Sequence, residues 1–148
     1  MIDTVVVATD GSESVGRAVD TALDLAARFD ADVHALSVID TGELDTTPDD
    51  IRTEMADALA ERAEDALADV AERADAPVTT AVREGRPSDE ILAYVREIDA
   101  DVVATGTRGR HGENRLLIGS VAERVVRDSP IPVLTVRRLE TDEIDGSA

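Results

Sequence analysis

The sequence has no cysteine, and because all 15 of its basic residues are arginine it has no lysine either. The lack of cysteine excludes disulfide bonds and thiolate metal sites. No stretch approaches the roughly 18 consecutive apolar residues that a membrane-spanning helix needs. The first residues lead directly into a valine-rich run, without the basic region and small-residue cleavage site of a signal peptide. We therefore expect a cytoplasmic protein without a membrane partner, and 148 residues is the usual size of one domain.

Acidic residues dominate the charge of the chain. Aspartate and glutamate number 33 against the 15 arginines, and the formal net charge is −18. In dilute buffer such charges repel one another over roughly 10 Å, whereas concentrated salt screens them. An ordinary acidic protein is the alternative, but the complete absence of lysine fits it poorly, so we expect a protein from a salt-accumulating halophile. The same charge argues against a nucleic-acid partner, which requires a basic face.

Short runs rich in β-branched residues alternate with alanine-rich helical patterns along the chain. Strands are predicted at residues 4–9, 32–39, 78–83, 101–105 and 133–137. Helices are predicted at residues 13–29, 48–74, 89–98 and 120–127, with a polar loop at 40–47 and Ser88 as a helix cap. This alternation predicts an α/β domain with a parallel sheet and helices on both faces.

The order of the strands follows from the handedness of their connections. Right-handed crossovers leave few arrangements, and we favour a doubly wound sheet in the order 3-2-1-4-5. Ligands bind such sheets beyond the carboxyl ends of the strands where the order reverses, here strands 1 and 4. The segments that follow these strands, residues 10–12 and 106–109, therefore mark the expected site.

A glycine-bearing loop follows the fourth predicted strand. Gly106 and Gly109 lack a Cβ, so a ligand can lie against their backbone. Ser120, preceded by Gly119, has capping-box spacing to Glu123 and is expected at a helix N-terminus, where free amides and the helix dipole attract anions. Each of these residues alone is more often a turn or cap residue, but together they predict a phosphate site. The loop is neither a P-loop nor the dinucleotide GxGxxG pattern.

The spacing of Gly106, Gly109, Gly119 and Ser120 matches the motif G-x2-G-x9-G-[S/T] at every fixed position. On this motif the sequence resembles the ATP-binding branch of the universal stress protein family. The segments VVVATDGSE, EGRPSDEIL and SVAERVVRDSPIPVLTVR are similar to that family as well, and the resemblance covers residues 3–138. It implies an α/β domain, a homodimer, and bound ATP that is hydrolysed slowly or not at all.

The resemblance also implies a role for individual residues. Asp10 would lie beside the ribose or a metal-linked phosphate, and Val38 would present backbone groups to the adenine. The remaining implied nucleotide contacts line the site, wrap the ribose and phosphates or close on the phosphate tail: Ala8, Thr9, Thr105, Gly106, Arg108, Gly109, Gly119, Ser120 and Val121. ATP is the expected ligand, with ADP, AMP or a cyclic nucleotide as alternatives, and Mg²⁺ would arrive with the nucleotide.

Few residues in the chain are suited to catalysis. His34 lies within a predicted strand and is expected to be a packed or edge histidine, while His111 is expected to be exposed in the loop. A dedicated ATPase needs a positioned base and charge-neutralising groups, and Asp10 is the only good carboxylate near the site, with Glu113 a weak second. We therefore favour a nucleotide-dependent regulatory protein. A slow ATPase or phosphotransferase, and a module that binds no nucleotide, remain alternatives.

The last predicted strand suggests a protein partner. Residues 133–136 would form a long apolar sheet edge, and such edges invite pairing with another strand. A symmetric homodimer that pairs these edges is expected, with shielding by the C-terminal residues as the alternative. Residues 139–148 are acidic and have little apolar surface, which predicts a disordered tail after a domain of residues 1–138. The downstream protein partner is unknown.

Overall fold

The computed structural model describes residues 1–107 and 118–137. In this part of the chain a five-stranded sheet has the order β3-β2-β1-β4-β5, and every neighbouring pair is parallel, as predicted. The strands are β1 (Thr4–Ala8), β2 (Asp32–Asp40), β3 (Val78–Gly85), β4 (Val102–Gly106) and β5 (Val133–Val136). The helices are α1 (Gly16–Phe29), α2 (Thr41–Asp45), α3 (Arg52–Arg73), α4 (Pro87–Glu97) and α5 (Ser120–Asp128).

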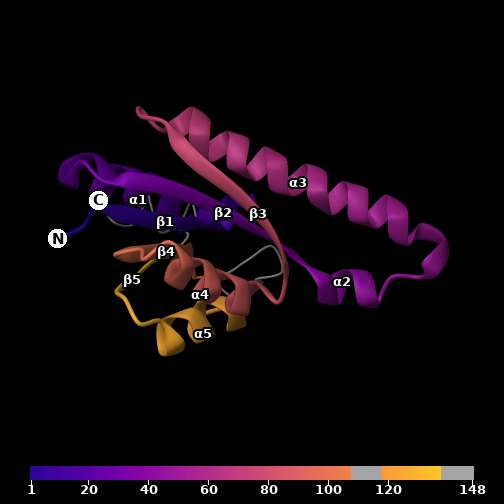
Figure 1. The fold of residues 1–148 in the computed structure, drawn as a ribbon. Coiled ribbons are helices and arrows are strands. Elements are labelled where there is room, and N and C mark those ends of the chain that lie inside the picture. The colour runs from indigo at the N-terminus through magenta and orange to yellow at the C-terminus, as the bar shows by residue number, and fades with distance from the viewer. Residues whose placement is uncertain (108–117, 138–148) are drawn as a thin grey trace, which may run out of the picture.

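Helices cover both faces of the sheet (Figure 1). Side chains of successive strand residues point to opposite faces, so each strand contributes to two cores. Val5 and Val7 of β1 pack in the cluster that includes residues of α1 and α3. Val6 of the same strand packs in the cluster that includes residues of α4 and α5. Burial on both faces explains why β1 is a continuous apolar run rather than an alternating one.

Two predictions about local structure are wrong. The segment 40–47, expected to be a polar loop, contains α2, because the Oδ1 atom of Asp40 caps it by accepting a hydrogen bond from the Gly42 amide at 2.9 Å. Ser88 is not a helix cap, since α4 begins at Pro87 with Arg86 in the capping position and Ser88 is buried in the first turn. Proline favours the first helical position, where its missing amide is not needed.

The long third helix also begins later than predicted. Pro48 has an extended backbone with ψ of 143°, and a 3-10 turn at Asp49–Ile51 precedes α3. The remaining boundaries agree with the sequence prediction to within a few residues, except that the first predicted helix divides into a 3-10 turn at Glu13–Val15 and α1.

A carboxylate connects two strands by hydrogen bonds at the amino-terminal end of the sheet. Asp101, just before β4, accepts hydrogen bonds from the amides of Asp3 at 2.8 Å and Thr4 at 3.0 Å. These two donors lower the pKa of the Asp101 carboxyl below its usual value. The carboxylate thus links the start of β1 to the start of β4, the two strands between which the sheet order reverses.

We predict that Asp101→Asn lowers the free energy of unfolding at neutral pH. Because the folded-state pKa of Asp101 is depressed, its contribution is present above the unfolded-state pKa of about 4 and is lost as the pH falls through the lowered value. The difference between variant and wild type should therefore shrink on acidification. Urea unfolding at pH values from neutral down to about 2 measures this difference. Asp57→Asn, at an exposed position on α3, is the control; an Asp101 effect of equal size at every pH would contradict the assignment.

Candidate functional site

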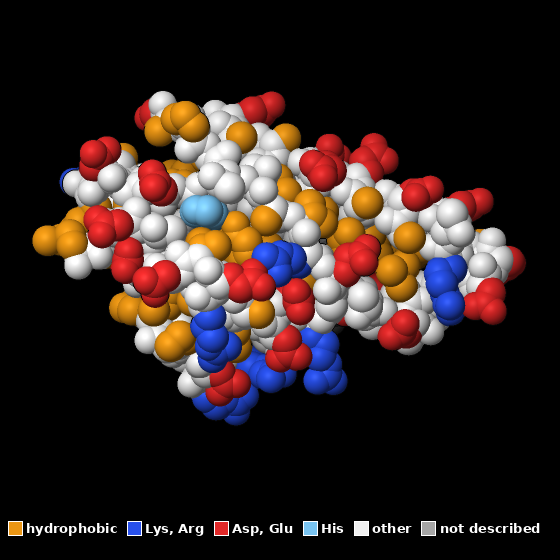
Figure 2. All heavy atoms as spheres, viewed as in Figure 1, with side chains coloured by type: hydrophobic (Ala, Val, Ile, Leu, Met, Phe, Trp, Pro, Cys, Tyr) orange, Lys and Arg blue, Asp and Glu red, His pale blue; other side chains and the backbone are white. Residues whose placement is uncertain are grey.

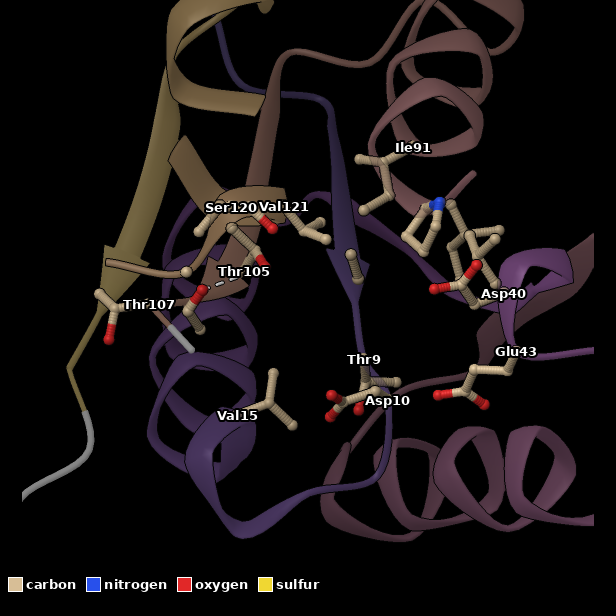
Figure 3. A pocket seen from close by; sticks show the side chains of 17 residues that line it. Thr9, Asp10, Val15, Asp40, Glu43, Ile91, Thr105, Thr107, Ser120 and Val121 are labelled. Carbon is tan, nitrogen blue, oxygen red and sulfur yellow. Dashed lines mark hydrogen bonds between the residues drawn. The ribbon is translucent and has the colours of Figure 1, made fainter. Parts of the chain in front are cut away.

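A pocket of about 340 Å³ opens beyond the carboxyl ends of β1 and β4 (Figure 3). Its place agrees with the topological prediction, because β1 and β4 are the strands at which the sheet order reverses. Nine of the predicted site residues line it: Ala8, Thr9, Asp10, Val38, Thr105, Gly106, Gly119, Ser120 and Val121. The other two, Arg108 and Gly109, lie outside the described residues, as do Arg110, His111, Glu113 and Arg115.

One end of the pocket is formed by the N-terminus of α5. Ser120, Val121 and Ala122, the first residues of this helix, all line the cavity. The first amides of a helix have no acceptor within the helix, and the helix dipole makes this end attractive to anions. The Gly119 amide donates a hydrogen bond to the Thr107 carbonyl oxygen, which joins the two described ends of the loop.

The predicted capping box at Ser120 is wrong. Gly119, with an extended backbone (φ −69°, ψ 158°), occupies the N-cap position, and no side chain caps the helix. Ser120 is instead the first helical residue, and its side chain is exposed. Because glycine supplies no side-chain acceptor, this helix end is left more open to an outside anion than a serine cap would leave it.

The loop that follows β1 is held by its own side chains. Its Asp10 Oδ1 atom accepts the Ser12 amide at 2.9 Å, and the Thr9 hydroxyl oxygen accepts the Gly11 amide at 3.1 Å. Gly11 has φ of +78°, and a Cβ at this position would lie 3.2 Å from the Cβ of Ala66 on α3. Asp10 therefore both forms a turn and lines the pocket, so its role in the turn does not exclude a role in binding.

The sequence prediction missed part of the apolar and acidic wall of the pocket. Leu36 and Asp40, which it did not include, lie two positions before and two after the predicted Val38 on β2, so all three residues face the same side of the sheet. Pro87 and Ile91, four residues apart on α4, add to the wall. Glu43 on α2 places a second carboxylate beside Asp40, and the further lining residues are Val15, Thr107 and Ala122. The period-two pattern of β2 could have indicated Leu36 and Asp40, but the packing of α4 and α2 against them has no local signal.

Charged side chains that line the described pocket are all acidic: Asp10, Asp40 and Glu43. Within residues 1–107 and 118–137, no group of three or more His, Asp or Glu side chains is arranged to hold a metal ion. The anion-attracting end therefore depends on backbone amides and a helix dipole rather than on described cationic side chains.

His34 belongs to a separate cluster outside this pocket. Its Nδ1 atom lies 2.9 Å from the hydroxyl oxygen of Tyr94, and the Arg83 guanidinium lies 5.1 Å from the centre of the tyrosine ring. Burial raises the pKa of Tyr94, and the hydrogen bond from Arg83 lowers the pKa of Glu97. His34 is thus a packed histidine, as predicted.

Comparison with known proteins identifies the family. A sequence model of the Universal stress protein family matches residues 1–137. The chain belongs to the universal stress protein family. Universal stress protein MJ0531 of Methanocaldococcus jannaschii is 35% identical over 138 residues, which cover 90% of this chain and 81% of that protein. A universal stress protein of Methanothermobacter thermautotrophicus is 33% identical over 131 residues, covering 84% of this chain and 89% of its own.

Solved structures of other universal stress proteins share the fold. UspA from Lactobacillus plantarum superposes with a TM-score of 0.78 at 27% identity, covering 91% of this universal stress protein and 97% of UspA. A universal stress protein in complex with cAMP superposes with a TM-score of 0.67 at 27% identity, covering 92% and 97% of the two chains. Among the described residues of the present protein, no helix is both long and apolar enough to cross a membrane.

Proposed function

We propose that this universal stress protein binds an adenine nucleotide, with ATP as its principal ligand, in the pocket beyond the carboxyl ends of β1 and β4. The observation that carries the proposal is the open N-terminus of α5 at the end of a pocket that also has an apolar wall. Helix N-termini bind phosphates, and the apolar wall suits a base. The cavity volume of about 340 Å³ falls in the range of small-molecule sites. The related structure in complex with cAMP supports an adenine nucleotide as the ligand class.

We assign to the predicted residues the nucleotide contacts that the resemblance implies. Val38 presents backbone groups to the adenine, Ala8 lines the site, Asp10 lies beside the ribose or a metal-linked phosphate, and Ser120 closes on the phosphate tail. Arg108 and Gly109 keep their predicted phosphate role, although they lie outside the described residues. Mg²⁺ would be held chiefly by the phosphates, with Asp10 as a protein carboxylate near them, because Mg²⁺ is commonly bound through substrate phosphates and few protein ligands.

The protein is proposed to hold the nucleotide rather than consume it. Phosphoryl transfer needs groups that orient the nucleophile and neutralise charge. The described lining contains no arginine or histidine, and Asp10 is engaged by the Ser12 amide. A slow ATPase or phosphotransferase that uses the same pocket is the alternative. In the preferred proposal, occupancy of the pocket regulates an unknown protein partner.

We further propose that two copies of the chain pair through β5. This strand ends the sheet order, and its four residues are all partly exposed. Pairing two such edges would satisfy backbone groups that a single sheet leaves to solvent. Residues 1–138 would form the folded domain and 139–148 a tail; the tail lies outside the described residues.

The composition supports a cytoplasmic protein of a salt-accumulating cell. Aspartate and glutamate side chains are spread over the face shown in Figure 2, while arginines gather around α4 and α5. With a net charge of −18, repulsion weakens as the screening length falls from about 10 Å in 0.1 M salt to about 3 Å in 1 M salt. Binding should therefore be measured in concentrated KCl, where the chain is expected to be most stable.

An equilibrium and turnover measurement on the same sample tests the function. In concentrated KCl with Mg²⁺, we expect the folded protein to bind one ATP per chain and to leave it intact. Nucleotide released by denaturation should be an adenine nucleotide, and chromatography identifies which one. Turnover at about 1 s⁻¹ would favour the enzyme alternative, since this is a typical catalytic rate. No binding by folded wild-type protein would refute the pocket assignment.

A further inference from the structure

Two carboxylates form the end of the pocket that lies away from the helix N-terminus. Figure 3 shows Asp40 and Glu43 at one end, Ser120 and Thr107 at the other, and Thr9 and Asp10 between them. If phosphates lie against α5, as in the proposed function, a nucleotide lying along the pocket directs its base toward Asp40. The apolar residues Val38 and Ile91 also line the cavity and suit the faces of a base.

The position of Asp40 is fixed by two features of the fold. It is the last residue of β2 and faces the pocket two positions beyond Val38, about 7 Å further along the strand. Its Oδ1 atom accepts the Gly42 amide at 2.9 Å as the cap of α2. The cap restrains the side chain, and the carboxylate points into the cavity (Figure 3). Glu43 follows one turn later on α2 and lines the same end.

We propose that Asp40, assisted by Glu43, determines base specificity by accepting a hydrogen bond from an exocyclic amino group of the base. A carboxylate only accepts hydrogen bonds, so it favours the 6-amino group of adenine. The 6-oxo group of hypoxanthine is itself an acceptor and would be repelled at the same position, so the carboxylate could accept only the neighbouring N1–H, for which the base would have to shift. The pocket then selects a 6-aminopurine over a 6-oxopurine. This inference rests on the proposed nucleotide site and adds the identity of the residue that selects the base.

ATP and ITP provide a direct test because they differ only in the group at position 6 of the purine and in the accompanying ring proton. The titrations are made by calorimetry in concentrated KCl with Mg²⁺. Wild-type protein should bind ATP roughly ten- to hundredfold more tightly than ITP, the range expected for a hydrogen bond to a charged group. ATP and ITP binding of equal strength would overturn the inference and leave the nucleotide site standing. The absence of binding by either nucleotide would remove the nucleotide site and this inference with it.

Asp40→Asn isolates the role of the carboxylate. Asparagine is as good an N-cap as aspartate, and its Oδ1 atom can keep the bond to the Gly42 amide. Its amide nitrogen then replaces the second acceptor with a donor, which suits a 6-oxo group. The ATP-to-ITP affinity ratio should fall at least about tenfold, with weaker ATP binding and equal or tighter ITP binding. An equal loss of affinity for ATP and for ITP would overturn the inference, because Asp40 would then act on a part of the molecule that the two nucleotides share, such as the ribose or the phosphates.

A matched control separates local hydrogen bonding from net charge. Asp45→Asn removes one negative charge from the same helix at an exposed position that does not line the pocket. It should leave the ATP-to-ITP ratio unchanged. Glu43→Gln should lower the ratio by less than Asp40→Asn does. A ratio that changes as much in Asp45→Asn as in Asp40→Asn would mean that charge alone is responsible, and it would contradict the assignment.

Discussion

Ser120→Asp should weaken ATP binding at least about fivefold in concentrated KCl while leaving the fold intact. Two like unit charges about 4 Å apart repel by about 4 kcal/mol in the intermediate dielectric near a protein surface, and a screening length of about 3 Å in 1 M salt leaves about a quarter of that repulsion. The new carboxylate would lie where the phosphates are proposed to lie. Ser120 is exposed and is the first residue of α5. An acidic residue in the first turn of a helix interacts favourably with its dipole. The variant should therefore melt no lower than the wild type in the absence of nucleotide.

The control for this variant is another aspartate in the first turn of a different helix. Thr53→Asp adds the same charge near the start of α3, at an exposed position outside the pocket lining. Its ATP affinity, measured by calorimetry in concentrated KCl, should equal that of the wild type. Undiminished ATP binding by a folded Ser120→Asp protein would mean that phosphates do not lie at the N-terminus of α5.

Thr135→Pro should convert a dimer into a monomer. The Val103 amide donates to the Pro132 carbonyl oxygen, and Val103 is aligned with Val133 in the parallel β4–β5 ladder. In such a ladder alternate residues of one strand bond to the same neighbour, so the Thr135 amide points to the outer edge. Proline there removes an outward donor and obstructs edge pairing without taking a hydrogen bond from β4.

Light scattering coupled to size-exclusion chromatography measures the mass of this variant. The wild type should have twice the chain mass of 15.7 kDa and Thr135→Pro the chain mass itself. Val126→Ser changes an exposed apolar residue on α5 and serves as the control for helix-face association. A dimeric Thr135→Pro protein, or a wild type that is monomeric at every concentration, would refute pairing through β5.

The sheet order was predictable because the sequence repeats one unit, a β-branched run followed by an amphipathic helix. Right-handed crossovers then leave few ways to arrange five such strands, and the order 3-2-1-4-5 is confirmed. The helix α2 was missed because residues 41–45 are short and lack an apolar period. The feature that marks the start of α2 is the cap at Asp40, whose side chain accepts a hydrogen bond from the Gly42 backbone amide. A search for apolar periodicity does not detect such a bond.

The pocket was predictable only in part, for a similar reason. Glycine spacing and strand ends indicated the wall made by β1, β4 and the start of α5, since these are properties of the local chain. The wall made by Ile91, Pro87 and Glu43 depends on how α4 and α2 pack against β2. This packing joins segments that are far apart in the sequence, so no local sequence pattern predicts it. The error at Ser120 arose because serine and glycine are both good N-caps and the sequence places them side by side.

Backbone-amide NMR during an ATP titration tests the central claim most directly, because it locates the ligand residue by residue. We predict that the largest shift changes among the described residues occur at the start of α5 (Ser120 and Val121), in the loop after β1 (Thr9 and Asp10) and around Val38. The amides of α3 around Asp57 should be unaffected. Saturating ATP that leaves the amides of Ser120 and Val121 unchanged would contradict the account.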